Sequence, residues 1–228
     1  MIEIRTTPNP PRTRLVSAVI SSLDKALRVD QLPAFTGIYA IPGMSGKKYR
    51  YFINTLVGSL GDTAYLEVGS WAGSTLCSAI YGNKVRAAAI DNWSTFNGPR
   101  DAFNRNLEAF ATNDTRVTVH EGDFRSIDYS KIGKFEIYLF DGPHGQKDQY
   151  DGLNLVRPAL KKEFVFIVDD WNWLAVRLGT FKAIQDCRIE TLYAAEIRTT
   201  LNNSHASVAN QQSDWHNGYF ISVLKQHK

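Results

Sequence analysis

The chain has 228 residues, of which 43% are hydrophobic, so it is long enough to bury the core of one large α/β domain. Its net charge of +3 is too small to indicate a nucleic-acid-binding protein, because such proteins cluster their basic residues on one face. No apolar run approaches the ~20 residues that span a bilayer, and two cysteines do not form a disulfide framework. The N-terminus lacks the apolar core of a signal peptide, so we expect a cytoplasmic protein without a membrane partner.

The first 60 residues have the pattern of an N-terminal helical extension. Residues 1–14 contain three prolines and are expected to be extended, without a regular element. Apolar residues at helical spacing predict an amphipathic helix over 14–27. A loop rich in Gly and Pro follows over 32–46, and a second helix is expected over 47–60. We expect residues 1–60 to act as a substrate lid or to mediate contacts between subunits, and residues 41–46 either fold over a cofactor or only join the two helices.

From residue 61 onward, strands and helices alternate regularly. The expected strands are short and apolar, and span 64–68, 85–90, 116–120, 135–140, 164–168, 191–197 and 219–224. The expected helices between them follow the turn at 69–73 as far as residue 81, and span 100–111, 146–161 and 174–186. This alternation predicts a doubly wound, mostly parallel seven-stranded α/β sheet in a single domain over 61–228. Because no helix separates the last two strands, they should form a C-terminal antiparallel hairpin.

The first strand of this domain ends in a glycine turn that runs from Glu67 to Gly73. In open α/β sheets, ligands bind beyond the carboxyl ends of the strands, so the residues there indicate function. Gly69 permits a tight turn, and Gly73 lets the next helix approach closely, with its N–H groups facing a polar ligand. Asp91 ends the second strand, where nucleoside-binding folds place a carboxylate on the ribose hydroxyls. Glycines in such a turn can also serve steric needs alone.

The pattern Glu67-x-Gly69-x-x-x-Gly73 followed by Asp91 resembles the cofactor signature of class I S-adenosylmethionine-dependent methyltransferases. Residues 121–124 resemble a later segment of that family, in which an acid and its neighbour hold the adenine. The resemblance runs from residue 63 to the C-terminus, and it implies S-adenosylmethionine as cofactor. The cofactor contacts that it implies are Glu67, Gly69, Ser70, Gly73, Asp91, Asp123, Phe124 and Asp141. Trp71 departs from the pattern, because many members carry a glycine there, and the incomplete glycine pattern also disfavours a dinucleotide-dependent oxidoreductase.

Two further strands end in acidic residues. Asp141 begins a D-G-P-H segment that ends at His144, and Asp169 and Asp170 follow the strand over 164–168. Neighbouring strand ends should bring these carboxylates together, and converging like charges need a neutralising partner such as Mg²⁺. A bound Mg²⁺ can lower the pKa of a substrate hydroxyl. His144 is a suitable general base for that hydroxyl.

The combination of Asp141-x-x-His144 with Asp169-Asp170 resembles the metal and base residues of macrocin/mycinamicin-type sugar O-methyltransferases, and catechol-type O-methyltransferases use a similar acid arrangement. The resemblance implies that Asp141, Asp169 and Asp170 are metal ligands and that His144 is the catalytic base. Gln146 departs from relatives that carry a tyrosine two residues after the histidine. On the plainer interpretation, Asp170 caps a helix and His144 is an ordinary loop histidine.

The sequence therefore predicts divalent-metal-assisted O-methylation of a hydroxylated small molecule such as a sugar or a natural product. Two alternatives stay open, namely a metal-independent methyltransferase and a non-catalytic S-adenosylmethionine-binding protein. The expected partner is a small-molecule hydroxyl acceptor rather than a nucleic acid, and a homo-oligomer is one option for the assembly. Trp93, Trp171 and Trp173 either form a wall of the acceptor site or pack in the core. His205 and His216 lie in the long polar segment before the last strand, where residues 214–217 either border the substrate or have no special role.

Overall fold

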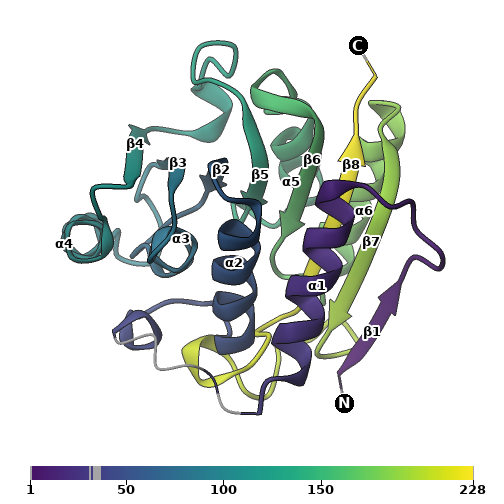
Figure 1. The fold of residues 1–228 in the computed structure, drawn as a ribbon, viewed down its shortest axis with the longest axis horizontal. Helices are drawn as coiled ribbons and strands as arrows, with labels where there is room; N and C mark the ends of the chain where they lie inside the picture. Colours follow the sequence, from purple (N-terminus) through teal and green to yellow (C-terminus); the bar gives the residue numbers. More distant parts are fainter. Residues whose placement is uncertain (1, 31, 33–36, 228) are drawn as a thin grey trace.

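The computed structural model describes residues 2–30, 32 and 37–227 (Figure 1). Its strands are β1 (Glu3–Thr6), β2 (Thr63–Val68), β3 (Val85–Asp91), β4 (Thr115–Glu121), β5 (Phe135–Phe140), β6 (Leu160–Val168), β7 (Glu190–Arg198) and β8 (Tyr219–Lys225). Its helices are α1 (Arg14–Arg28), α2 (Lys47–Leu60), α3 (Ser74–Ile80), α4 (Arg100–Phe110), α5 (Gln146–Asn154) and α6 (Leu174–Asp186), with short 3₁₀ turns η1 (Ile38–Ala40), η2 (Phe124–Ser126), η3 (Arg157–Ala159) and η4 (Asn210–Gln212). The loop expected over 32–46 includes 33–36, which lie outside the described residues. Within the described part of the chain, no helix combines the length and apolar character needed to cross a membrane.

All of these strands join one sheet in the order β1-β7-β8-β6-β5-β2-β3-β4. Strands β4, β3, β2, β5 and β6 pair in parallel, and β8 lies antiparallel between β6 and β7. The predicted doubly wound sheet and its C-terminal antiparallel hairpin are thereby confirmed. The chain passes from β2 outward to β3 and β4 on one side, and later to β5 and β6 on the other. The carboxyl ends of β2 and β5 therefore flank the switch point at which such sheets bind ligands.

The N-terminal segment differs from the prediction, because it contributes an eighth strand to the sheet. β1 pairs antiparallel with β7, with Ile4 opposite Ile197. The N–H of Thr7 then donates to the carbonyl of Ala194 at 2.9 Å. Without β1, the edge of β7 would present unpaired N–H and C=O groups. The local sequence gave no sign of this strand, because its pairing partner lies at the other end of the chain.

The helix expected over 146–161 is also shorter in the structure. α5 ends at Asn154, the turn η3 follows, and β6 begins at Leu160 rather than at residue 164. Pro158 accounts for the difference, because proline has no N–H to donate and its ring would clash with the carbonyl four residues earlier, that of Asn154, where α5 ends.

Helices cover both faces of the sheet. Figure 1 shows α1 and α2 in front of the sheet and α5 and α6 behind it. On the front face, α1, α2 and α3 pack against alternate strand residues such as Tyr65 and Leu139. On the other face, α5 and α6 pack against the intervening ones, such as Leu66 and Phe140. Covering on both faces explains why the strands are continuously apolar, and it makes α1 and α2 part of the same core as the sheet.

Candidate functional site

A cavity of about 540 Å³ lies at the carboxyl ends of the parallel strands. Most of the predicted site residues line it, namely Gly69, Asp91, Asp123, Phe124, Asp141, His144, Asp169 and Asp170. Glu67, Ser70 and Gly73 are buried and do not form part of the cavity wall. Met44, from the segment 41–46, also lines the cavity, so this segment does more than join two helices. The volume falls in the range of small-molecule and cofactor sites.

The glycine turn passes very close to the neighbouring strand end. Gly69 has a φ of 89°, and a Cβ at this position would lie 2.0 Å from the carbonyl oxygen of Asp141. Only glycine can adopt this φ at low cost and also leave room for the Asp141 carbonyl. Trp71 replaces the glycine that is common in the resembling family, yet its φ is 46°, in the same left-handed region. Trp71 thus adopts a backbone conformation that usually favours glycine.

Asp91 is held firmly at the cavity wall. Its two carboxylate oxygens accept hydrogen bonds from the backbone N–H groups of Trp71 and Trp93, each at 2.7 Å. An ionised carboxylate has about four acceptor positions, so two remain for hydroxyl groups of a ligand. This geometry suits the ribose-binding role that the sequence resemblance implies. Trp93 itself packs against Phe103 of α4, with ring centroids 5.2 Å apart.

Asp123 and Phe124 form a wall with one polar and one apolar side chain. Phe124 is buried edge-on against Phe140, with ring centroids 5.3 Å apart. The guanidinium of Arg125 lies 4.4 Å from the centre of the Phe124 ring. Asp123 accepts the N–H of Arg125 at 2.8 Å. Contact with the adenine of a cofactor stays a prediction for these two residues.

Glu67 lies behind the turn rather than in the cavity wall. Its carboxylate accepts hydrogen bonds from the hydroxyl of Tyr65 at 2.5 Å and from that of Thr75 at 2.9 Å. Burial raises the pKa of Glu67 to about 7, against the opposing effect of these hydroxyls. Contact with the methionine amine of a cofactor stays a prediction for this residue.

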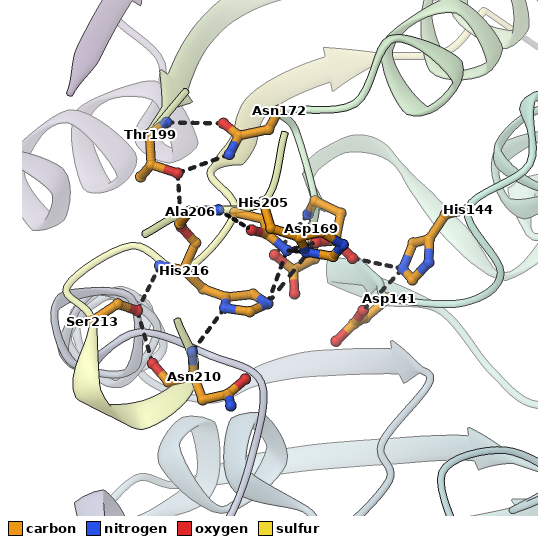
Figure 2. Close-up of polar contacts among 12 residues, drawn as sticks. Asp141, His144, Asp169, Asn172, Thr199, His205, Ala206, Asn210, Ser213 and His216 are labelled. Atoms are coloured by element: carbon orange, nitrogen blue, oxygen red, sulfur yellow. Dashed lines mark hydrogen bonds and ion pairs between the residues drawn. The ribbon is translucent and has the colours of Figure 1, made fainter. Parts of the chain in front are cut away.

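Asp141, His144 and Asp170 meet in another part of the cavity wall, which begins beside Gly69. His144 Nε2 lies 2.7 Å from Asp170 Oδ2 and 4.0 Å from Asp141 Oδ1 (Figure 2). Burial alone would lower the pKa of His144, but the two carboxylates outweigh it and raise that pKa to about 10. Burial raises the pKa of Asp141 to about 6. For Asp170, burial is outweighed by His144, which holds the pKa of the carboxyl below its ordinary value.

The same three residues form the group that fits a metal ion. One ligand atom from each of Asp141, His144 and Asp170 lies within 4.8 Å of the other two. Asp169 lies outside this group, because successive side chains at a strand end point to different sides. Its Oδ1 accepts the N–H of Asp170 at 2.7 Å, and burial raises its pKa well above the ordinary value. The carboxylate oxygens of Asp141 and Asp170 are the kind of donor that a hard divalent cation prefers, and a ligand role for Asp169 stays a prediction.

The late polar segment, for which the sequence left a substrate-bordering role open, contributes His205, Asn210, His216 and Asn217 to the cavity wall. Asn217 donates from Nδ2 to Asp170 Oδ1 at 2.6 Å. Figure 2 shows His205 and His216 gathered around the same point, and both line the cavity. The N–H of Asn210 donates to His216 Nδ1 at 2.9 Å. The sequence held one signal for the role of this segment. It connects β7 to β8 and therefore lies at the edge of the sheet where the acids lie.

Of the tryptophans near strand ends, one faces the site and another is core. Trp173 lines the cavity, and its ring centroid lies 4.8 Å from that of His144. Trp171 is fully buried and stacks on Phe220 at 4.5 Å. Trp173 therefore fits the interpretation as part of a site wall, and Trp171 fits the interpretation as core packing.

Known proteins with similar features are methyltransferases. A protein-family model described as a methyltransferase domain matches residues 66–171. The SAH-bound methyltransferase PaMTH1 of Podospora anserina has a similar structure, with a TM-score of 0.57 and 12% identity over 98% of this chain and 90% of its own. The O-methyltransferase from Bacillus cereus in complex with SAH gives a TM-score of 0.52 and 16% identity over 94% and 92% of the two chains. The precorrin-6y C5,15-methyltransferase from Geobacter metallireducens gives 0.53 and 16% over 78% and 88%. A search of curated proteins finds no match.

The likeness to these structures shows a Rossmann-like methyltransferase fold. The matched residues 66–171 include the glycine turn, Asp91 and the Asp141, His144 and Asp170 group. The family-model match and the shared fold together support a methyltransferase.

Proposed function

We propose that this protein is an O-methyltransferase that uses S-adenosylmethionine and a divalent cation, such as Mg²⁺, to methylate a hydroxylated small molecule of the sugar or natural-product class. The observation that carries the proposal is that one cavity joins two kinds of wall. One wall contains Gly69 and Asp91, and the other contains Asp141, His144 and Asp170. A cofactor site that adjoins a cation and base site within one cavity is an arrangement that suits hydroxyl methylation.

The cofactor wall is proposed to bind and orient S-adenosylmethionine, which supplies an electrophilic methyl group when bound. The free acceptor positions of Asp91 take the ribose hydroxyls, and Asp123 with Phe124 takes the adenine. Because Gly69 has no side chain, the turn after β2 can pass close to the Asp141 carbonyl at the end of β5. A rigid turn and a fixed carboxylate favour one bound orientation, and orientation is a major part of the rate gain in a two-substrate reaction.

The other wall is proposed to activate the acceptor hydroxyl. Asp141 and Asp170 would hold the cation, which lowers the pKa of a hydroxyl bound to it. His144 accepts the hydroxyl proton at Nε2, and it must be neutral to do so. Its ion pairs with the two carboxylates favour the imidazolium form. A cation held by Asp141 and Asp170 would repel the positive charge of the imidazolium and so lower the pKa of His144. The neutral ring could then accept a proton at Nε2.

One observation favours a second candidate, a metal-independent methyltransferase. Asp170 already has two partners, because His144 lies at 2.7 Å from one oxygen and Asn217 donates to the other at 2.6 Å. An imidazolium ring can therefore neutralise the carboxylates without a cation. In that case His144 and Asp170 would orient the acceptor hydroxyl directly.

The test is calorimetric titration of S-adenosylmethionine into the wild-type protein and into Asp91→Asn, with Mg²⁺ and with a chelator. Asp91→Asn keeps the size of the side chain but removes its charge and one acceptor oxygen. We expect it to weaken cofactor binding at least tenfold, about 1.4 kcal/mol. The matched control is Asp24→Asn, an exposed residue of α1 paired with Arg28, which should bind the cofactor as the wild type does.

Transfer of labelled methyl groups to a panel of sugars and phenols then separates the two candidates. Transfer that stops on chelation and returns with Mg²⁺ supports the metal-assisted reaction. Transfer that is unaffected by the chelator contradicts it and supports the metal-independent enzyme. Absence of any cofactor binding would remove both candidates.

A further inference from the structure

A second cavity, of about 560 Å³, lies at the opposite end of the strands from the cofactor cavity. It is formed where strands β2 to β6 begin, together with the residues just before them. Its lining residues that carry charge are Asp62, Lys84, Arg86, Asp114, Arg116, Lys134 and Lys161. No residue lines both cavities, so this one is separate from the site described above.

Positive charge is in excess in this second cavity. Five of its lining residues are basic and two are acidic. Lys84 is paired with Asp62 at 3.2 Å, and Lys161 with Glu136 at 3.2 Å. Among the described residues, Arg86, Arg116 and Lys134 have no carboxylate within ion-pair distance. Three cations without an ion-pair partner thus line one hollow, although Asp114 lines it too and Lys134 Nζ donates to the carbonyl of Pro158 at 2.5 Å.

Two of these cations stand side by side on neighbouring strands. Arg86 of β3 and Arg116 of β4 are register partners in a parallel pair, so their side chains leave the sheet on the same face. Like charges placed opposite each other on adjacent strands destabilise a sheet. The arrangement becomes favourable when an anion lies between the two guanidinium groups.

Arg86 is also held in place before any ligand arrives. Its guanidinium lies 4.8 Å from the centre of the Phe135 ring, and its Nη2 donates to the carbonyl of Lys134 at 2.6 Å. A guanidinium that is stacked on a ring and fixed at one edge loses little freedom when it binds a ligand. Its remaining N–H groups can form the parallel pair of hydrogen bonds that phosphate oxygens accept.

We propose that this cavity is a binding site for the phosphate group of a small phosphorylated molecule, formed by Arg86, Arg116 and Lys134. A phosphate ester carries up to two negative charges and three acceptor oxygens, and so matches the excess positive charge better than a single carboxylate does. The basic residues are scattered along the sequence. They meet because parallel strands begin at one edge of the sheet.

The test is calorimetric titration of inorganic pyrophosphate into the full chain and into Arg116→Gln and Arg86→Gln. Arg116 has no hydrogen-bond or ion-pair partner among the described residues, so Arg116→Gln should fold normally. We expect each substitution to weaken pyrophosphate binding about fivefold or more, and the double variant to show no binding. The pyrophosphate affinity of Arg86→Lys should lie between those of the wild type and Arg86→Gln, because lysine keeps the positive charge but lacks the planar guanidinium that donates two parallel hydrogen bonds. Arg105→Gln, an exposed arginine of α4, removes the same charge elsewhere and should leave binding unchanged.

Three outcomes would overturn the proposal. The first is that pyrophosphate does not bind the wild-type protein at low-millimolar concentration. The second is equal weakening in Arg105→Gln and Arg116→Gln, which would mean that only net charge matters. The third is a short single-stranded RNA that binds much more tightly than pyrophosphate and depends on the same arginines, which would make the surface a nucleic-acid contact instead. None of these readouts depends on methyl transfer, so they stand apart from the fate of the proposed function.

Discussion

Five non-glycine residues in the described cavity wall have a positive φ, and two of them, Trp71 and Asp170, lie just after the ends of β2 and β6. Trp71 has a φ of 46° and Asp170 a φ of 56°. Such a conformation costs on the order of 1–3 kcal/mol and persists only where the surroundings enforce it. In each case a carboxylate does so, because Asp91 accepts the N–H of Trp71 and Asp169 accepts the N–H of Asp170. The acids at the strand ends therefore shape the backbone as well as offering charge to a ligand.

The close approach at Gly69 gives a prediction at the scale of a single atom. In Gly69→Ala the new Cβ would meet the Asp141 carbonyl at 2.0 Å, in addition to the cost of a φ of 89°. We expect the free energy of unfolding to fall by about 3 kcal/mol or more, with loss of cofactor binding. Gly82→Ala is the matched control, because Gly82 has a φ of 66° and nothing within 4 Å of its Cβ position. Equal losses in the two variants, measured by urea unfolding, would show that backbone conformation alone is responsible.

The buried Glu67 predicts a pH-dependent stability. Burial raises its pKa from 4.5 to about 7, so the folded state holds this proton more tightly than the unfolded state. The stability that this group contributes is full below pH 4.5 and is lost as the pH rises towards 7. Glu67→Gln has no such loss, so its free energy of unfolding relative to wild type should rise by about 3 kcal/mol across that window. Urea unfolding below pH 4.5 and above pH 7 measures the change, and Glu108→Gln, exposed on α4, should show none.

At the scale of elements, one buried arginine organises the segment that brings Met44 to the cavity. Arg50 of α2 is fully buried and donates to Ser45 Oγ at 2.9 Å and to the carbonyls of Ile38 and Ile41 at 2.8 and 3.0 Å. Burial lowers the pKa of Arg50 to about 10. Ser45 in turn contacts the first residue of α3, since its Oγ lies 3.2 Å from that of Ser74. The side chain of Arg50 thus connects α2 to the segment between η1 and α2, and through Ser45 that segment contacts α3.

Arg50→Met should therefore loosen this segment. The carbonyls that Arg50 pairs would be left buried without donors, which costs about 1–3 kcal/mol for each group that stays unsatisfied. We expect a loss of about 2–4 kcal/mol in the free energy of unfolding and faster amide hydrogen exchange over residues 41–47. Cofactor affinity should fall as well, because Met44 would lose its position. Arg28→Met, at an exposed residue paired with Asp24, should change none of the three measurements.

At the scale of the whole molecule, the N-terminal helices and the sheet share one hydrophobic core. α1 and α2 contribute buried side chains to the same cluster as β2, β5 and β6. These side chains are Leu15, Val16, Val19, Leu23, Ala26, Tyr49, Phe52, Ile53, Leu56 and Val57. Each large one buried contributes about 1.5–3 kcal/mol, and a whole domain is stable by only about 5–15 kcal/mol.

We therefore predict that residues 61–228 do not fold without the preceding segment. The fragment would expose one face of the sheet, and it should lack a cooperative thermal transition by circular dichroism. Addition of residues 1–60 as a separate chain should restore some structure if the shared core is the cause. A fragment that melts cooperatively on its own and binds S-adenosylmethionine would contradict this and make the extension a dispensable lid.

Much of the fold and part of the site followed from the sequence, because they depend on local pattern. Apolar runs and helical spacing marked the strands and helices, and the ends of those strands marked Gly69, Asp91, Asp141, His144 and Asp170, all of which line the cavity. A side chain that follows a strand lies at the carboxyl edge of the sheet whatever the rest of the chain does. That is why these positions could be identified before any contact was known.

The tertiary structure alone decided the features that join distant parts of the chain. The pairing of β1 with β7, the bond from Asn217 to Asp170 and the meeting of Arg86 with Arg116 each depend on how the strands are ordered in space. The grouping of Asp141 and His144 with Asp170 rather than with Asp169 likewise emerges only in the folded structure. Local sequence fixes which residues reach an edge of the sheet, and long-range packing fixes which of them touch.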